Sequence, residues 1–194
     1  MTRLELMFEC AGFEKPVWGL PVAVPSWVRR GLIGWRVVPE QVDAGVPEPV
    51  ARLIASALVS HSRVTFAERP TLSLVHTTDA GAAQRLFDSE GFDWTMGAQV
   101  VFLSAPSAPP PAVSEAHMRA AFDGAQFDGI AGTGATGLLL PGVDGDVAGL
   151  YAFSDRLWDG LASALRCACR NSGAVWREVE EGEFSELVAG QRPD

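Results

Sequence analysis

The chain has 194 residues, of which 47% are hydrophobic and 20% are charged. This composition is typical of a protein that buries a core, and it excludes an intrinsically disordered chain. Acidic residues number 24 against 15 basic ones, which gives a formal net charge of -9. Nucleic acid is therefore excluded as an expected partner, because phosphate binding needs clustered positive charge. The length favours a single domain, residues 1–194.

The amino-terminal residues lack the long apolar segment of a signal peptide, and prolines and arginines interrupt the most apolar stretch, 16–38. We therefore expect a cytoplasmic protein without a membrane-spanning segment. Cys167 and Cys169 are two residues apart on an expected helix, so their side chains point in different directions. That spacing suits neither a disulfide nor a shared metal, and we interpret both as reduced thiols.

The first half of the chain mixes expected strands and helices. Alternating or β-branched apolar runs predict strands at 4–8, 31–38, 64–68, 71–76 and 99–103. An apolar stripe after two prolines predicts a helix over 50–58, and Asp79 can cap another that runs to residue 90. The tract 104–111 contains four prolines, which predicts an exposed loop and the only candidate internal boundary.

In the second half, Ser114 precedes an expected helix that ends at Phe122, and the glycine-rich segment 123–137 is expected to be irregular. Two apolar runs, 138–140 and 147–153, predict a hairpin. Ser154 can cap the longest helix, which ends at Gly173, and a strand is expected over 175–179.

These elements predict an α+β fold, with a mostly antiparallel sheet and three or four helices packed on one face. Residues 54–58, Ile-Ala-Ser-Ala-Leu, are echoed at 161–165 as Leu-Ala-Ser-Ala-Leu. Each copy lies on a helix that precedes a strand, which suits a weak two-fold pseudo-repeat. Alanine-rich helices also produce such echoes by chance.

The sequence holds no persuasive catalytic or metal-binding motif. Residues 132–137 match the G-x-G-x-x-G spacing, but a helix precedes them and Pro141 follows, so a surface loop is the preferred interpretation over a nucleotide site. The histidines are too far apart for a zinc motif, and Asp144 and Asp146 lack the other ligands of a calcium loop. We therefore expect no metal and no cofactor. Paired carboxylates could still assemble from distant acids, so the sequence does not decide whether the protein is an enzyme.

Of six tryptophans, most are expected in the core, and Trp176 is the exception. On a strand it shares a face with Glu178 and Glu180, and Glu181 extends the acidic run. An aromatic ring beside carboxylates is typical of a surface that grips a partner. Asp144 and Asp146 in the hairpin turn complete the predicted partner-binding set. The alternative is a solvated edge strand that is protected by charge.

Negative charge, surplus aromatic residues and missing catalytic motifs together favour a non-enzymatic protein-binding inhibitor. The most concrete form is a bacterial immunity protein that neutralises a basic cognate toxin through an acidic surface. The alternative is a small-molecule-binding domain or enzyme that uses 123–137 as a lid. A structural subunit that dimerises through the Trp-rich first segment is the third hypothesis. The sequence leaves the oligomeric state and the strand order open.

Overall fold

The computed structural model describes residues 3–9, 20–21, 23–38, 48–69, 71–87, 98–123, 126–142 and 147–179, with only the backbone described at 3–5, 7, 9 and 36–38. The strands are β1 (Arg3–Glu9), β2 (Arg29–Val38), β3 (Arg63–Glu68), β4 (Ser73–Thr77), β5 (Gln99–Ser104), β6 (Gly137–Pro141), β7 (Val147–Ala152) and β8 (Val175–Val179). The helices are α1 (Glu48–His61), α2 (Ala80–Phe87), α3 (Glu115–Asp123), α4 (Phe127–Ala131) and α5 (Asp155–Ser172).

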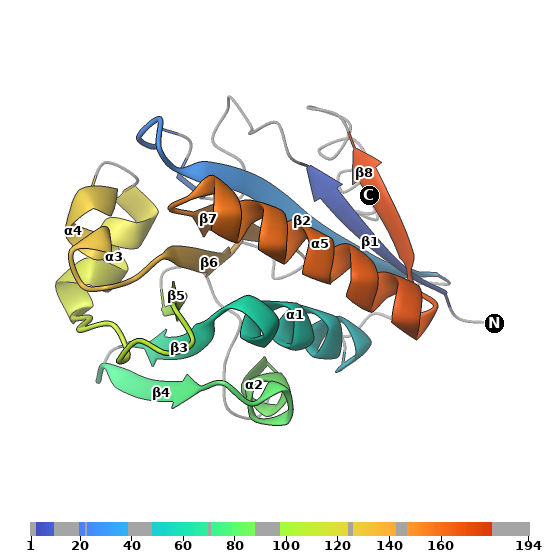
Figure 1. Cartoon of the computed structure of the whole chain (residues 1–194), viewed down its shortest axis with the longest axis horizontal. Helices are drawn as coiled ribbons and strands as arrows, with labels where there is room; N and C mark the ends of the chain where they lie inside the picture. Colours follow the sequence, from blue (N-terminus) through green and yellow to red (C-terminus); the bar gives the residue numbers. More distant parts are fainter. Residues whose placement is uncertain are drawn as a thin grey trace, which may run out of the picture.

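The eight strands form one sheet in the order β4-β3-β5-β6-β7-β2-β1-β8. Every neighbouring pair is antiparallel except β1 and β8, which run parallel (Figure 1). The strands that flank the 104–111 tract pair within this sheet, because β5 is hydrogen-bonded to β6. The structure confirms the predicted α+β fold with a mostly antiparallel sheet.

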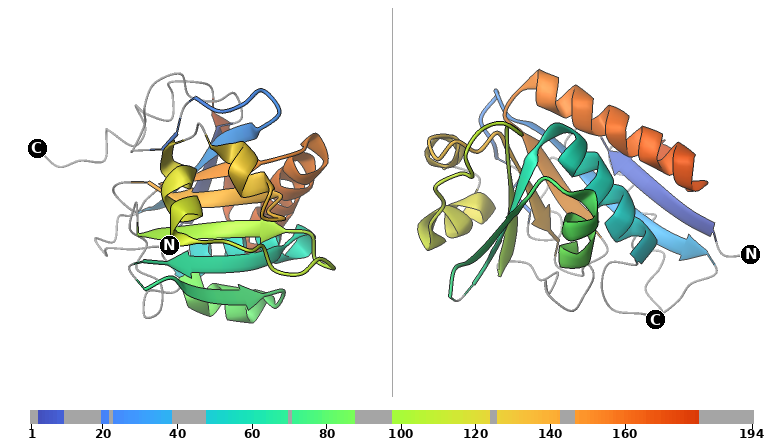
Figure 2. Two further views of the ribbon diagram at one scale, coloured as in Figure 1. Left: turned by 90° about the vertical axis from the view of Figure 1, so that its left-hand side faces the viewer. Right: turned by 60° about the horizontal axis from the view of Figure 1, so that its bottom comes forward.

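Three helices, α1, α2 and α5, cover one face of the sheet, as Figure 2 shows from two sides. The apolar stripe of α1 supplies Val50, Ile54 and Leu58, each no more than 1% exposed. Phe66 of β3 meets Phe87 of α2 edge-on, with ring centroids 4.9 Å apart. This layer is the larger core, and it confirms the predicted packing of three helices on one side.

The two short helices α3 and α4 pack on the opposite face, which the sequence did not predict. Phe127 and Ile130 of α4 are fully buried there. The prediction that 123–137 would be irregular is therefore wrong, since residues 127–131 are helical and Gly137 begins β6. Apolar residues recur three apart in this segment, and the glycines obscured that spacing.

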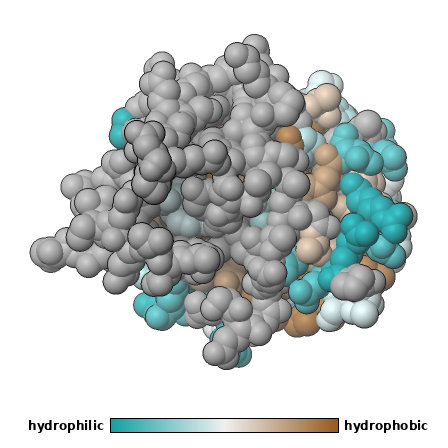
Figure 3. All heavy atoms as spheres, turned by 180° about the vertical axis from the view of Figure 1, so that it is seen from behind, coloured by the Kyte–Doolittle hydropathy of each residue, from teal (hydrophilic) through white to brown (hydrophobic). Residues whose placement is uncertain are grey.

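Seen from behind, the described residues show hydrophilic and hydrophobic side chains interspersed (Figure 3).

The two halves of the chain repeat one order of elements. The hairpin β1–β2 leads to α1 and β3, and the hairpin β6–β7 leads to α5 and β8. Helices α1 and α5 lie side by side on the same face (Figure 1). The echoed segments 54–58 and 161–165 hold matching places in these helices, with buried ends and exposed central serines. This arrangement is what a weak two-fold pseudo-repeat predicts.

The predicted helix boundaries depend on specific caps. The Asp79 carboxylate accepts the backbone N–H of Ala82 at 2.7 Å, and the Ser154 hydroxyl accepts that of Leu157 at 3.2 Å. Gly173 ends α5 at φ 74°, a left-handed conformation that favours glycine. Within the described ranges, none of the helices combines the length and apolar composition needed to cross a bilayer.

Candidate interaction surface

Strand β8 places Trp176 and Glu178 at one edge of the sheet. Among the described strands it pairs only with β1, and Val179 is its last residue. The sequence continues from Val179 directly into Glu180 and Glu181. Those two residues, like Asp144 and Asp146 between β6 and β7, lie outside the described residues.

The Trp176 indole packs against an aromatic side chain of the core. Its ring centroid lies 5.2 Å from that of Phe8, which is fully buried on β1. Phe8 in turn stacks on Trp158 of α5, with centroids 5.5 Å apart. Trp176 is half-buried, so one part of the ring rests on this aromatic cluster and another part reaches the surface.

A hydrogen bond and an ion pair connect the surface side of this ring to its neighbours. The indole Nε1 donates to Glu178 Oε1 at 3.2 Å, which places both side chains on one face of β8, as the alternation predicts. Arg166 of α5 donates through Nη2 to the same carboxylate oxygen. Its guanidinium carbon lies 5.8 Å from the centroid of the Trp176 ring, a cation–π distance. We call Trp176, Glu178 and Arg166 the β8 cluster.

The β8 cluster holds Glu178 in its charged form. The hydrogen bond from Trp176, followed by that from Arg166, lowers the pKa of Glu178 below its ordinary value. Arg166 balances this charge locally, so Glu178 does not present an isolated negative charge to solvent.

The net negative charge of the chain lies mostly elsewhere. Side chains that the structure describes include eleven arginines and nine acidic residues. The remaining residues contain fifteen acidic side chains against four basic ones, and this excess accounts for the overall charge of -9. Glu180, Glu181, Asp144 and Asp146 belong to that acidic remainder. The acidic field expected from the sequence therefore arises from these segments and not from the described face of β8.

The partners of Trp176 were only partly accessible to sequence reasoning. The alternation within β8 predicted Glu178. Arg166 was missed, although only Gly173 and Ala174 separate α5 from β8 and so return the chain alongside the helix. Phe8 was missed because it comes from the other end of the chain, and a parallel β1–β8 pairing leaves no local signal.

The histidines and the cysteines of α5 are explained by their immediate surroundings. Each histidine lies beside a hydroxyl: His61 beside Ser60 in α1, His76 beside Thr65 of the paired strand β3, and His117 beside Ser114, the residue before α3. Among the described residues, no three His, Cys, Asp or Glu side chains come together as a metal site. Burial raises the pKa of the Cys169 thiol to about 11, while Cys167 is exposed.

The glycine-rich match at 132–137 has the wrong structural context for a nucleotide site. It connects helix α4 to strand β6, whereas a dinucleotide fingerprint connects a strand to a helix. Two of its glycines are explained by the conformation and close packing of the backbone. Gly134 has φ 92°, and a Cβ on Gly137 would lie 2.6 Å from the Tyr151 carbonyl oxygen.

Comparisons with protein-family models, with curated proteins and with solved structures find no match to this chain.

Proposed function

We propose that the protein is a non-enzymatic protein-binding inhibitor, most concretely an immunity protein of bacterial type that neutralises a basic cognate toxin. The β8 cluster is the observation that carries the proposal, because it presents an aromatic ring, a carboxylate and a guanidinium together at a sheet edge. Tryptophan and arginine dominate the energetics of protein interfaces.

The packing of Trp176 supports a role as an anchor. Phe8 holds one side of the indole, and Glu178 fixes its N–H, so binding a partner freezes little further side-chain motion. An anchor that is ordered before binding loses less conformational entropy on association.

The charge distribution supports separate roles for Trp176, which anchors a partner, and for the acidic residues, which attract it. Glu180 and Glu181 follow the last residue of β8 in sequence, and Glu183 and Glu186 continue the acidic run. Negative charge that follows the anchor closely in sequence accelerates encounter with a basic partner, while the Trp176 ring, covered by that partner, sets the lifetime of the complex.

The lid alternative receives less support, because the segment 126–137 is bonded to its surroundings. The backbone N–H of Thr136 donates to the Leu103 carbonyl at 2.6 Å, and Thr133 accepts from the Ala112 N–H at 3.1 Å. These bonds attach both sides of the glycine-rich loop to the body of the protein.

The test is co-expression with the products of adjacent genes, followed by measurement of binding kinetics for any complex. We expect Trp176→Ala to weaken affinity by at least about 2 kcal/mol, roughly 30-fold, mainly through faster dissociation. Reversing Glu178, Glu180 and Glu181 to arginine is expected to slow association and to weaken its salt dependence.

Glu48→Arg is the matched control for reversing Glu178 alone, since Glu48 is an exposed carboxylate that also pairs with an arginine, Arg52, but lies on α1. It should leave both rate constants close to those of the natural chain. Failure of every adjacent gene product to bind would overturn the proposal. A complex whose affinity is unchanged by Trp176→Ala would also overturn it.

A further inference from the structure

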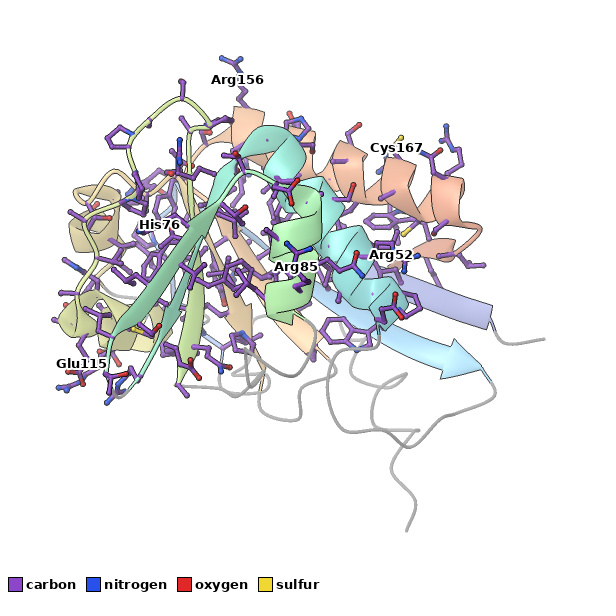
Figure 4. The ribbon with its side chains drawn as sticks, turned by 90° about the horizontal axis from the view of Figure 1, so that it is seen from below. Arg52, His76, Arg85, Glu115, Arg156 and Cys167 are labelled. Carbon is purple, nitrogen blue, oxygen red and sulfur yellow. The ribbon has the colours of Figure 1, made fainter. Side chains whose placement is uncertain are left out.

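In the part of the chain that the structure describes, β4 forms the edge of the sheet opposite β8. Among the described strands, β4 pairs only with β3. Ser73, Val75 and His76 are exposed, and Val75 is 42% exposed, one of two large hydrophobic side chains so exposed in the described chain. In the view from below, β4 lies in front with α2 beside it (Figure 4).

The two edges of the sheet differ in charge. Strand β8 carries Arg177 and Glu178, and Arg166 pairs with the latter. Strand β4, Ser-Leu-Val-His-Thr, carries neither an acidic side chain nor an arginine, lysine or proline. Charges and prolines are the usual means by which natural proteins prevent an edge strand from pairing with another chain. Strand β8 carries such charges, and the five residues of β4 do not.

We propose that β4 is the interface of a homodimer, in which it pairs antiparallel with β4 of a second copy about a two-fold axis at Val75. In that register Val75 lies opposite Val75 of the second copy, and Leu74 lies opposite its His76. Ser73 lies opposite its Thr77. The pairs are related by the two-fold axis, as an interface between identical chains requires, and none of them opposes two carboxylates or two guanidinium groups.

Electrostatics favours β4 over β8 as the place where two such chains meet. Each copy carries a net charge of -9 and repels a second copy, so the contact that adds no further like-charge repulsion is favoured. Pairing through β4 meets that condition, because its five residues bring no carboxylate or guanidinium together. Pairing two β8 strands about their central residue would set Arg177 against Arg177.

Packing on the helix side favours the same register. Val75 lies opposite Phe66 of β3, whose ring packs on Phe87 of α2. Two Val75 side chains meeting at the axis would extend this apolar layer from one copy into the next. Burial of the exposed valines supplies the hydrophobic contribution to association.

Under the function proposed above, the dimer has a consequence for stoichiometry. Strands β4 and β8 are at opposite edges of the sheet, so joining two sheets through β4 leaves both β8 clusters at the far ends. Such a dimer binds two partner molecules, one at each end.

Sedimentation equilibrium of the full chain tests the dimer directly. We expect a concentration-dependent dimer that Val75→Lys abolishes, because it sets two ammonium groups together at the axis. Val75→Ile is the matched control, since isoleucine is uncharged, apolar and β-branched like valine, and it should retain the dimer. Circular dichroism spectra of both variants establish that they fold.

A cysteine at position 75 tests the register. In a Cys10→Ser, Cys167→Ser background, Val75→Cys should oxidise to a covalent dimer, because opposed residues of antiparallel strands have Cα atoms about 4.5–5.5 Å apart. Ser73→Cys should remain monomeric on oxidation, since its opposite residue is Thr77 of the second copy.

A natural chain that stays monomeric at all concentrations overturns the dimer, as does a dimer that survives Val75→Lys. Equal cross-linking through Ser73→Cys and Val75→Cys overturns the register. These outcomes are separable from failure of the proposed function, because the Val75→Lys monomer retains the β8 cluster. It should bind a cognate partner with unchanged affinity per site.

Discussion

The indole nitrogen of Trp176 donates a hydrogen bond to Glu178, two residues further along the same edge strand, at 3.2 Å. Arg166 contacts both side chains from the neighbouring helix. A ring, a carboxylate and a guanidinium therefore form one unit, and the buried ring of Phe8 supports it from the core.

Glu178→Gln should remove a small, pH-dependent contribution to stability. The pKa of Glu178 is lowered in the folded protein, so its charged form stabilises the fold above the ordinary glutamate pKa of 4.5. That contribution is lost as the pH falls through the lowered value. The difference in free energy of unfolding between natural chain and variant should therefore be constant near neutral pH and vanish in acid. Because the pair is about half exposed, we expect less than about 1 kcal/mol. A difference that grows in acid would contradict the assignment.

Gly137→Ala should destabilise the fold by about 1–3 kcal/mol, because the new Cβ would meet the Tyr151 carbonyl oxygen at 2.6 Å and the strands must separate. Gly129→Ala is the control. It lies in α4, where a Cβ would have no heavy atom within 4 Å beyond the backbone of its own helix, and alanine should stabilise that helix slightly. Urea unfolding of both variants measures the contrast, and equal effects would show that β6 and β7 are not so closely apposed.

His117 should stabilise the start of α3. Its Nδ1 accepts the backbone N–H of Ser114 at 3.0 Å, which is the reciprocal half of a capping box. We expect His117→Ala to cost about 0.5–1 kcal/mol in thermal or urea unfolding, and His117→Gln to restore most of it, because glutamine can reach the same N–H. No difference between alanine and glutamine would argue against this cap.

The thiols of α5 should differ sharply in reactivity. In a Cys10→Ser background, the exposed Cys167 should react rapidly with a thiol reagent at neutral pH. Cys169 is buried and its pKa is raised to about 11, so the reactive thiolate is scarce and inaccessible. It should react only on unfolding. Cys167→Ser should remove the fast phase alone, which stopped-flow absorbance can follow.

Local features of the fold were predictable from the sequence, whereas long-range ones were not. Strand alternation and caps such as Asp79 and Ser154 act within a few residues, and the structure confirms them. The short helix α4 was missed, because glycines hid its apolar spacing. In the β8 cluster, sequence spacing predicted that Trp176 and Glu178 share a face, whereas Phe8 contacts Trp176 through a strand pairing that no local pattern encodes.

The place of the β6–β7 hairpin constrains when the sheet can form. It pairs with β5 on one side and with β2 on the other, so it joins β4-β3-β5 to the rest of the sheet. A nascent chain therefore carries β2 and β5 with unpaired edges until residue 152 has left the ribosome. Closure between such distant segments is slow, because loop entropy is lost before the contacts form. The sheet should thus complete in one step that waits for this hairpin.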